Sequence, residues 1–460
     1  MSAAKIGLLS LTALVFSSMV GSGVFSLPQN MAQVANGSAL LVAWLITGVG
    51  IIFLALSLLH LTRQRPDLDG GIYNYAREGF GDLIGFCSAW GYWLCTTIGI
   101  VGYVVIAFSG VGMFTDSKDH VIFGEGNTLY SLIGSSIFVW LVHWLVSRGI
   151  KEAAIVNLLA TIAKIIPMVV FIFFTFIAFK FDLFKLNLND FSLKVPLWQQ
   201  VKDLMLITLW VFTGIEGAVV LSSRAKNRHD IGKATILGVL LALSFYVMVT
   251  VLAYGVVSRE ALAGMHNPSM ATILQQLIGL PGTIIITIGL IISVSSSYLS
   301  WTLFATVIPY LAAKNGAFPK LFLKNNQNNV PISSLWLTTI VVQGSLIAVY
   351  FFNKNYTQLL LISSVMILLP YFLVSAFYLK ESIRHKRTPH IAIASVASIY
   401  ALWLLYAAGL DLSLLHLSEP TTLGMISSAV SCFKTNLINI HWTKHKQHNS
   451  KQNNTVHTHY

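Results

Sequence analysis

The chain has 460 residues, of which 55% are hydrophobic and only 10% charged, and its mean hydropathy is +0.72. These values exclude an ordinary soluble globular protein and indicate a polytopic membrane protein. The net charge of +12 does not indicate nucleic-acid binding, because the basic residues lie in short loops between apolar segments. The three cysteines, Cys87, Cys95 and Cys432, give neither a disulfide framework nor the spacing of metal ligands.

Apolar runs long enough to cross a bilayer follow one another along the chain, and a weaker candidate comes last. The runs cover residues 6–34, 39–61, 82–114, 128–148, 153–179, 203–223, 233–257, 276–312, 332–352, 357–379 and 389–410, and the weaker candidate covers 421–440. The sequence therefore predicts an all-α membrane protein of about twelve helices. The loops between the runs are too short to hold a soluble domain.

The C-terminal part of the chain departs from this pattern. Residues 411–440 hold the weak last helix, which is rich in Ser, Thr and Asn, and residues 441–460 form a basic tail that we predict to be disordered. His441, His445 and His448 have the spacing of metal ligands on a helix, but a solvated tail is the simpler interpretation. The sequence predicts no metal site and no cofactor.

Lysine and arginine are concentrated in alternate loops. The basic loops carry Arg63, Arg65, Arg77, Arg148, Lys151, Arg224, Lys226, Arg228, Lys233, Lys314, Lys320, Lys324, Lys380, Arg384, Lys386 and Arg387. Most intervening loops are poor in basic residues. Residues 180–202 are the exception, and acidic residues are interspersed among the lysines there. The positive-inside rule therefore places the N-terminus in the cytoplasm.

The first apolar run contains a stretch that disfavours a continuous helix. Its residues 19–28 read MVGSGVFSLP, and two glycines, a serine and a proline interrupt the helical pattern near the middle of the run. Irregular backbone at membrane depth survives only where it is buried in protein or lines a cavity. Such a break presents backbone N–H and C=O groups and a helix N-terminus, which together favour a carboxylate. A tight helix-packing site is the alternative.

The sixth run is interrupted in the same way. Residues 206–218 read LITLWVFTGIEGA, with glycines near the middle of the run and Glu216 beside them. The two interrupted runs occupy matching positions in two five-span halves, and an odd number of spans makes the halves run in opposite senses. Paired interrupted helices in inverted repeats indicate the midplane site of a transporter. An ion channel is the competing class, although no filter motif appears, and nothing indicates a membrane enzyme.

At these positions the chain resembles the amino acid–polyamine–organocation superfamily, in particular the basic amino acid/polyamine antiporters, and among them the arginine/ornithine antiporters. The resemblance runs from about residue 6 to 410 and depends on motifs in family order. They are GSGVFSLPQNMA at 21–32, PDLDGGIY at 66–73, SAWGYW at 88–93, RGIKEA at 148–153, WVFTGIEGA at 210–218 and SWTL at 300–303. The resemblance implies a transporter core over residues 1–410, with inverted repeats at about 6–180 and 200–380 and an eleventh helix.

The resemblance also implies a substrate site. The carboxylate would be held at Ser22 and Gly23, and the cationic side chain would pack on Trp301. Such cation–π contacts are worth about 0.5–2 kcal/mol. The α-ammonium would meet exposed carbonyls of both breaks. The residues around these carbonyls are Met19, Val20, Trp210 and Thr213.

Further positions follow from the same resemblance. Cys95 and Thr96 would line the side-chain pocket, and Ser363 would add a polar contact. The distal gate would consist of Tyr92, Glu216 and Tyr371. A carboxyl within a span is usually functional, and low-dielectric surroundings favour its neutral form, so protonation of Glu216 would couple to gating. A protonated acid that only caps the break is the alternative.

Lys164 lies deep in the fifth run, with apolar residues on both sides. A lysine there costs about 2.5–3.5 kcal/mol unless it faces protein and finds partners. We expect carbonyls of the first break and the hydroxyls of Ser296, Ser297 or Ser300 to supply them. The lysine resembles the one that replaces a bound cation in sodium-independent relatives, which implies transport without sodium. A purely stabilising role is the alternative.

The predicted function is exchange of a basic amino acid, arginine or lysine, for ornithine or a related amine such as agmatine, by alternating access in the cytoplasmic (inner) membrane. One departure concerns specificity: where arginine-handling relatives carry an asparagine, this chain has Ile100, which cannot hydrogen-bond a substrate. The alternatives are a proton-coupled symporter of broader specificity and a sensor that binds without transport. The expected partners are the substrate and the lipid bilayer. The oligomeric state stays open, with a homodimer as one alternative.

Overall fold

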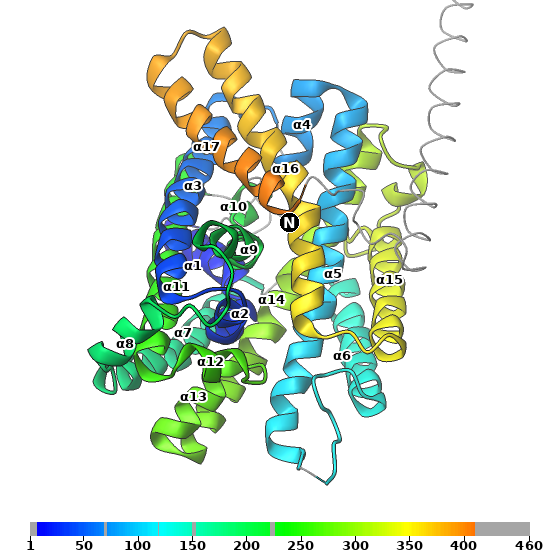
Figure 1. Ribbon diagram of the computed structural model, residues 1–460. Helices are drawn as coiled ribbons and strands as arrows, with labels where there is room; N and C mark the ends of the chain where they lie inside the picture. Colours follow the sequence, from blue (N-terminus) through cyan, green and yellow to red (C-terminus); the bar gives the residue numbers. More distant parts are fainter. Residues whose placement is uncertain (1–6, 69–70, 118, 150–152, 221–225, 410–460) are drawn as a thin grey trace, which may run out of the picture. The chain divides into compact units, whose positions relative to one another are not determined.

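The computed structural model describes residues 7–68, 71–117, 119–149, 153–220 and 226–409 (Figure 1). These residues form α-helices joined by short loops and two 3₁₀-helices, with a single isolated β-bridge between Asn325 and Pro331. The predicted all-α class is therefore confirmed. The weak helix at 411–440, the tail at 441–460 and Cys432 lie outside the described residues.

The helices follow one another as Figure 1 labels them. They are α1 (Leu8–Met19), η1 (Gly23–Ser26), α2 (Leu27–Val34), α3 (Gly37–Gln64), α4 (Ile72–Phe80), α5 (Asp82–Thr115), α6 (Leu129–Ser147), α7 (Ala153–Ile177), α8 (Phe181–Leu188), α9 (Leu197–Trp210), α10 (Gly217–Val220), α11 (Arg228–Val256), α12 (Arg259–Ala263), α13 (Ser269–Ile278), α14 (Leu280–Lys314), η3 (Lys320–Leu323), α15 (Ile332–Phe351), α16 (Tyr356–Arg384) and α17 (Thr388–Ala407).

Within the described residues, 9 helical segments are long and apolar enough to cross a membrane. The segment Leu8–Val34 counts as one of them although it is broken, and α7 with α8 gives a tenth if that pair, bent by 100°, is one span. The sixth predicted run appears as α9, a non-helical stretch and α10, and is described only as far as Val220. In the described part of the chain, the positions of these helical segments agree with those of the predicted apolar runs.

The two interrupted segments are surrounded by continuous helices. Helix α1 packs against α7, α10, α11 and α14, while α5 packs along both α14 and α16. In Figure 1, α5 and α16 run beside each other past the short helices α9 and α10. The continuous helices bury the irregular backbone of both breaks, as its unpaired polar groups require at membrane depth.

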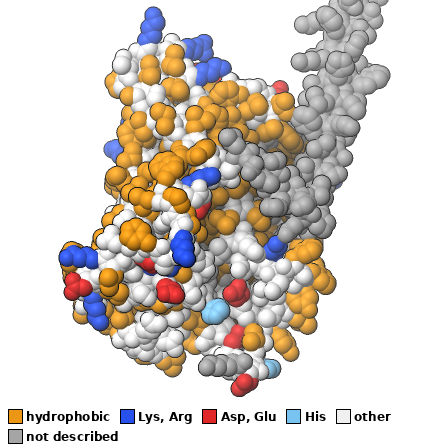
Figure 2. All heavy atoms as spheres, in the orientation of Figure 1, with side chains coloured by type: hydrophobic (Ala, Val, Ile, Leu, Met, Phe, Trp, Pro, Cys, Tyr) orange, Lys and Arg blue, Asp and Glu red, His pale blue; other side chains and the backbone are white. Residues whose placement is uncertain are grey.

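The surface has the polarity of a membrane protein. Figure 2 shows hydrophobic side chains over most of the visible face. Lys and Arg side chains lie at its upper end, where Figure 1 places the loop between α16 and α17, and again at the lower left, around α8. Large apolar side chains such as Leu45, Ile137 and Ile399 are exposed, as lipid-facing positions allow.

Candidate functional site

The first break lies where the sequence predicts it. Helix α1 ends at Met19, and helical structure resumes only at Gly23 and, after a 3₁₀ turn, continues into α2, which carries Pro28 in its first turn. Proline is well tolerated there because the first N–H groups of a helix have no intrahelical partner. Met19, Val20, Ser22 and Gly23 are all buried. The break is thus enclosed by protein.

Side chains from other helices take up the carbonyls that the first break leaves free. Ser293 on α14 donates to the carbonyl oxygens of Val20 at 3.2 Å and Gly21 at 2.8 Å. The indole Nε1 of Trp301, also on α14, donates to the Ser18 carbonyl at 3.1 Å. Because each carbonyl oxygen has two lone pairs, those of Gly21 and Ser18 keep the capacity to accept a second donor. The Val20 carbonyl already has two donors, since it also accepts Lys164 Nζ at 2.9 Å.

The second break crosses the first. Helix α9 ends at Trp210, and turns lead through Gly214 to α10. Gly214 has a φ of +108°, which favours glycine, and a Cβ there would lie 2.7 Å from the Ser18 carbonyl oxygen. The Ser18 hydroxyl in turn donates to the Gly214 carbonyl at 2.8 Å. A Cβ on Gly23 would lie 2.7 Å from Val211, so the two breaks need glycine to approach so closely.

Three aromatic side chains meet beside the breaks. The centroid of the Trp301 ring lies 5.5 Å from that of Trp210 and 5.1 Å from that of Tyr103, both in edge-to-face arrangements. Gly99 on α5 makes room for them, because a Cβ there would lie 2.9 Å from Trp210 and closer still to Trp301. Trp301 is only 1% exposed. It therefore lies at the breaks and not against lipid.

Tyr356 is a member of the site that sequence reasoning missed. Its hydroxyl lies 2.9 Å from the Ser22 hydroxyl and accepts a hydrogen bond from Trp210 Nε1 at 2.9 Å. It is the first residue of α16, directly after the capping residue Asn355. The sequence contains no signal for this contact beyond a tyrosine at the start of an apolar run.

The expected pocket residues of α5 are buried around Gly99. Ser363 of α16 donates to the Cys95 carbonyl at 2.7 Å, and its hydroxyl lies 3.4 Å from the Cys95 thiol. The Thr96 hydroxyl donates to carbonyl oxygens of its own helix. The Thr213 hydroxyl donates to the Leu209 carbonyl at 3.4 Å. Ile100 is fully buried. The structure thus joins Cys95 to Ser363 but shows no such bond from Thr96 or Thr213 to another element.

The three residues of the expected distal gate are in direct contact. Tyr92 on α5 and Tyr371 on α16 each donate a hydrogen bond of 2.8 Å to Glu216, one to each carboxyl oxygen. Glu216 is 1% exposed and lies in the second break, just before α10. One carboxyl group therefore connects two continuous helices to the interrupted sixth span.

Lys164 on α7 is fully buried and reaches the first break. Its Nζ donates to the Ser17 carbonyl at 3.1 Å, the Ser17 hydroxyl at 2.9 Å, the Val20 carbonyl at 2.9 Å and the Ser297 hydroxyl at 3.1 Å. Of the expected hydroxyl partners, Ser297 is the one that bonds to it. Ser300 instead donates to its own helix, and Ser296 lies 3.4 Å from the Ser17 hydroxyl. The ammonium thus ties α1 and α14 together through neutral oxygens.

The chemistry available here is that of binding and of moving helices. Among the described residues, no three His, Cys, Asp or Glu side chains are grouped so that they could hold a metal ion. The breaks offer N–H groups, hydroxyls, carbonyls with spare lone pairs, aromatic rings and one buried carboxyl group. This set suits a small zwitterion with a cationic side chain.

Comparison with known proteins agrees with this geometry. A family model described as "Amino acid permease" matches residues 6–441. A protein of Escherichia coli (strain K12) named "Putative arginine/ornithine antiporter" is 55% identical over 405 residues, which cover 88% of this chain and 87% of that protein. The "Arginine/ornithine antiporter" of Pseudomonas aeruginosa is 43% identical over 430 residues, 90% of this chain and 88% of the relative.

A third relative carries a different name. The "Arginine/agmatine antiporter" of Chlamydia caviae is 42% identical over 422 residues, which cover 88% of this chain and 86% of that protein. The family model covers nearly the whole chain, and all three relatives are matched over most of their length. The chain belongs to the amino acid permease family.

Proposed function

We propose that this protein exchanges basic amino acids across a membrane, taking up arginine or lysine in return for ornithine or a related amine such as agmatine. The observation that carries the proposal is the buried crossing of two interrupted helices beside Trp301. The names of the relatives, which are 42–55% identical over most of the chain, support arginine, ornithine and agmatine as substrates. A transporter that works by alternating access becomes an exchanger when the empty protein cannot return to its starting conformation and only the protein with a bound substrate can.

In this proposal the first break binds the carboxylate and the carbonyls bind the α-ammonium. The N–H groups that open η1 at Gly23 and the Ser22 hydroxyl are donors that suit an anion. The carbonyls of Gly21 and Ser18 already accept one donor each and have a second lone pair for the ammonium, whereas the Val20 carbonyl accepts both Ser293 and Lys164.

The cationic tail would pack on Trp301. Its ring now contacts Trp210 and Tyr103, so the tail would have to enter among these rings and displace some of their contacts. Ile100 of α5 is buried and has a hydrocarbon side chain that offers no hydrogen bond, so it gives arginine no advantage over lysine or ornithine.

Other parts of the proposal concern the surroundings of the site. Glu216 with Tyr92 and Tyr371 would act as the gate that closes over the substrate, and Lys164 would take the place of a bound sodium ion. The protein would lie in the cytoplasmic (inner) membrane. Its N-terminus would lie in the cytoplasm, because Lys and Arg are concentrated in alternate loops. The core would comprise residues 1–410 with repeats at 6–180 and 200–380.

Counterflow in proteoliposomes tests the proposal. Vesicles loaded with labelled ornithine are diluted into arginine, lysine, agmatine, histidine or leucine, and the efflux of ornithine is followed. We expect arginine and lysine to accelerate efflux and leucine to have little effect. Equal stimulation by leucine would overturn the basic-substrate assignment. Uptake that needs a proton gradient but no internal ornithine would instead show a symporter.

A further inference from the structure

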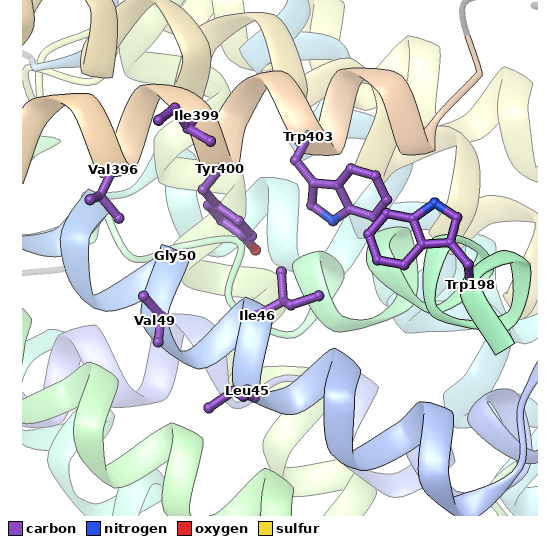
Figure 3. A pocket seen from close by; sticks show the side chains of 9 residues that line it. All are labelled: Leu45, Ile46, Val49, Gly50, Trp198, Val396, Ile399, Tyr400 and Trp403. Carbon is purple, nitrogen blue, oxygen red and sulfur yellow. The ribbon is translucent and has the colours of Figure 1, made fainter.

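A groove on the surface of the helix bundle lies away from the central site. It has a volume of about 460 Å³ and runs between α3 and α17, with the first turn of α9 at one end (Figure 3). Its lining is formed by Leu45, Ile46, Val49, Gly50, Trp198, Val396, Ile399, Tyr400 and Trp403. Leu45 and Ile399 are 68% and 65% exposed, so the groove is open on a side of the bundle where large apolar side chains are uncovered.

One end of the groove differs from the rest. Figure 3 shows the indoles of Trp198 and Trp403 together at this end, and their ring centroids are 4.6 Å apart. Trp198 lies in the first turn of α9 and Trp403 near the end of α17, which runs to Ala407. Tryptophans near the ends of spanning helices lie at the level of the lipid headgroups.

This aromatic end also has a donor and a positive charge. The Nε1 atom of Trp403 is buried and has no hydrogen-bond partner among the described residues, and Figure 3 shows it on the side of the ring that faces the groove. Lys202 follows Trp198 by four residues on α9 and places its Nζ 5.2 Å from the centroid of the Tyr406 ring on α17. The nearby carboxylate of Asp203 accepts a hydrogen bond from Gln199 at 2.8 Å.

From these features we propose that the groove binds an anionic glycerophospholipid, with one acyl chain along α3 and α17 and its headgroup at the aromatic end. The apolar lining suits the chain, the free N–H of Trp403 suits an ester or phosphate oxygen, and Lys202 attracts the negative charge. A helix from a second copy of this chain would also fill the apolar part of the groove, but its apolar lipid-facing side chains would bring no negative charge to Lys202.

Lipid retention by the purified full-length protein tests the proposal, independently of transport. The protein is equilibrated with phosphatidylglycerol or phosphatidylcholine, and the bound lipid is measured by native mass spectrometry. We expect phosphatidylglycerol to be retained in preference. Lys202→Gln should weaken its retention by about fivefold, the effect of one cation near an anionic surface. Trp403→Phe should weaken the retention of both lipids by about threefold, as expected for the loss of one hydrogen bond.

Two matched variants serve as controls. Lys185 also lies over an aromatic ring, that of Phe181 at 4.7 Å, and Trp336 on α15 is 46% exposed, but neither lines the groove. Lys185→Gln and Trp336→Phe should leave lipid retention unchanged. Equal retention of the two lipids, or an equal loss in the controls, would overturn the proposal. So would recovery of a dimer that Trp403→Phe dissociates, since a second copy would then occupy the groove.

Discussion

The hydroxyl of Tyr356 lies 2.9 Å from that of Ser22, and it thereby joins the first residue of α16 to the break in the first span. The same oxygen accepts the indole N–H of Trp210, which ends α9 before the second break. One phenol therefore holds both interrupted segments to a continuous helix. A movement that separates either break from α16 has to break or exchange these bonds.

Removing this hydroxyl should slow transport. Tyr356→Phe leaves the buried N–H of Trp210 without its partner, and losing one hydrogen bond costs about 0.5–1.5 kcal/mol. We expect ornithine counterflow to fall by roughly twofold to tenfold while the protein still inserts and purifies normally. Tyr350→Phe on α15, away from both breaks, is the matched control. Unchanged counterflow in Tyr356→Phe would mean that the bridge has no part in the cycle.

Trp301 is expected to set the preference for cationic substrates. Trp301→Leu removes the ring that would face the cation. The substitution should weaken the binding of arginine and lysine by about 0.5–2 kcal/mol. Trp301→Phe should retain more of the affinity because a ring remains. Binding is measured by competition against labelled ornithine. An affinity for arginine that stays at the wild-type level in Trp301→Leu would place the cation elsewhere.

Glu216 is expected to give exchange its pH dependence. The carboxyl group accepts from both Tyr92 and Tyr371, and an amide in its place cannot titrate. Glu216→Gln should therefore flatten the pH profile of counterflow while the protein stays folded. Tyr92→Phe, which removes one of the two bonds but keeps the acid, should lower the rate and keep the profile. If the Glu216→Gln profile matches wild type, the acid only caps the break.

The sequence predicted the breaks and the residues in them but not how their polar groups are paired. Gly21, Gly23 and Pro28 disfavour a continuous helix and so mark the break in the sequence, but the space that Gly21 and Gly23 leave for Tyr103 and Val211 is visible only in the fold. The bond from Ser22 to Tyr356 joins residues 334 positions apart, and nothing in either segment specifies it. The Lys164 partners were predicted as a class of hydroxyls and carbonyls, and only the fold selects Ser297 among neighbouring serines.

Asp116 gives a prediction about stability and pH at the end of α5. Burial alone would raise the pKa of this carboxyl, but the backbone N–H groups of Phe123, Gly124 and Ile122 donate to it and bring the pKa below its ordinary value. A carboxylate with a lowered pKa stabilises the fold above the pKa of about 3.9 that it has when unfolded, and this contribution disappears as the pH falls further.

Asp116→Ala should accordingly destabilise the protein by about 1–3 kcal/mol at pH 7, since hydrogen bonds to a charged group are lost. Thermal unfolding in detergent measures the difference in stability between the wild-type protein and Asp116→Ala. This difference should become smaller below about pH 4, as the wild-type carboxyl is protonated. Asp119→Ala, at an exposed position of the same loop, is the control and should change little. A difference that stays constant down to low pH would show that the charge of Asp116 is not what stabilises the loop.

Lys164 leads to the prediction that transport does not require sodium. Its Nζ donates to Ser17 and Val20 of the first break and to Ser297 of α14, so the lysine already occupies the place between these helices. Lys164→Ala should abolish or uncouple exchange without preventing membrane insertion, because the freed carbonyls lose the cation that joins them. Lys164→Met, which keeps the length of the side chain but not its charge, should fail in the same way. Counterflow is compared in sodium and in choline buffers. Wild-type exchange that depends on sodium would contradict the assignment, since one site cannot hold both cations.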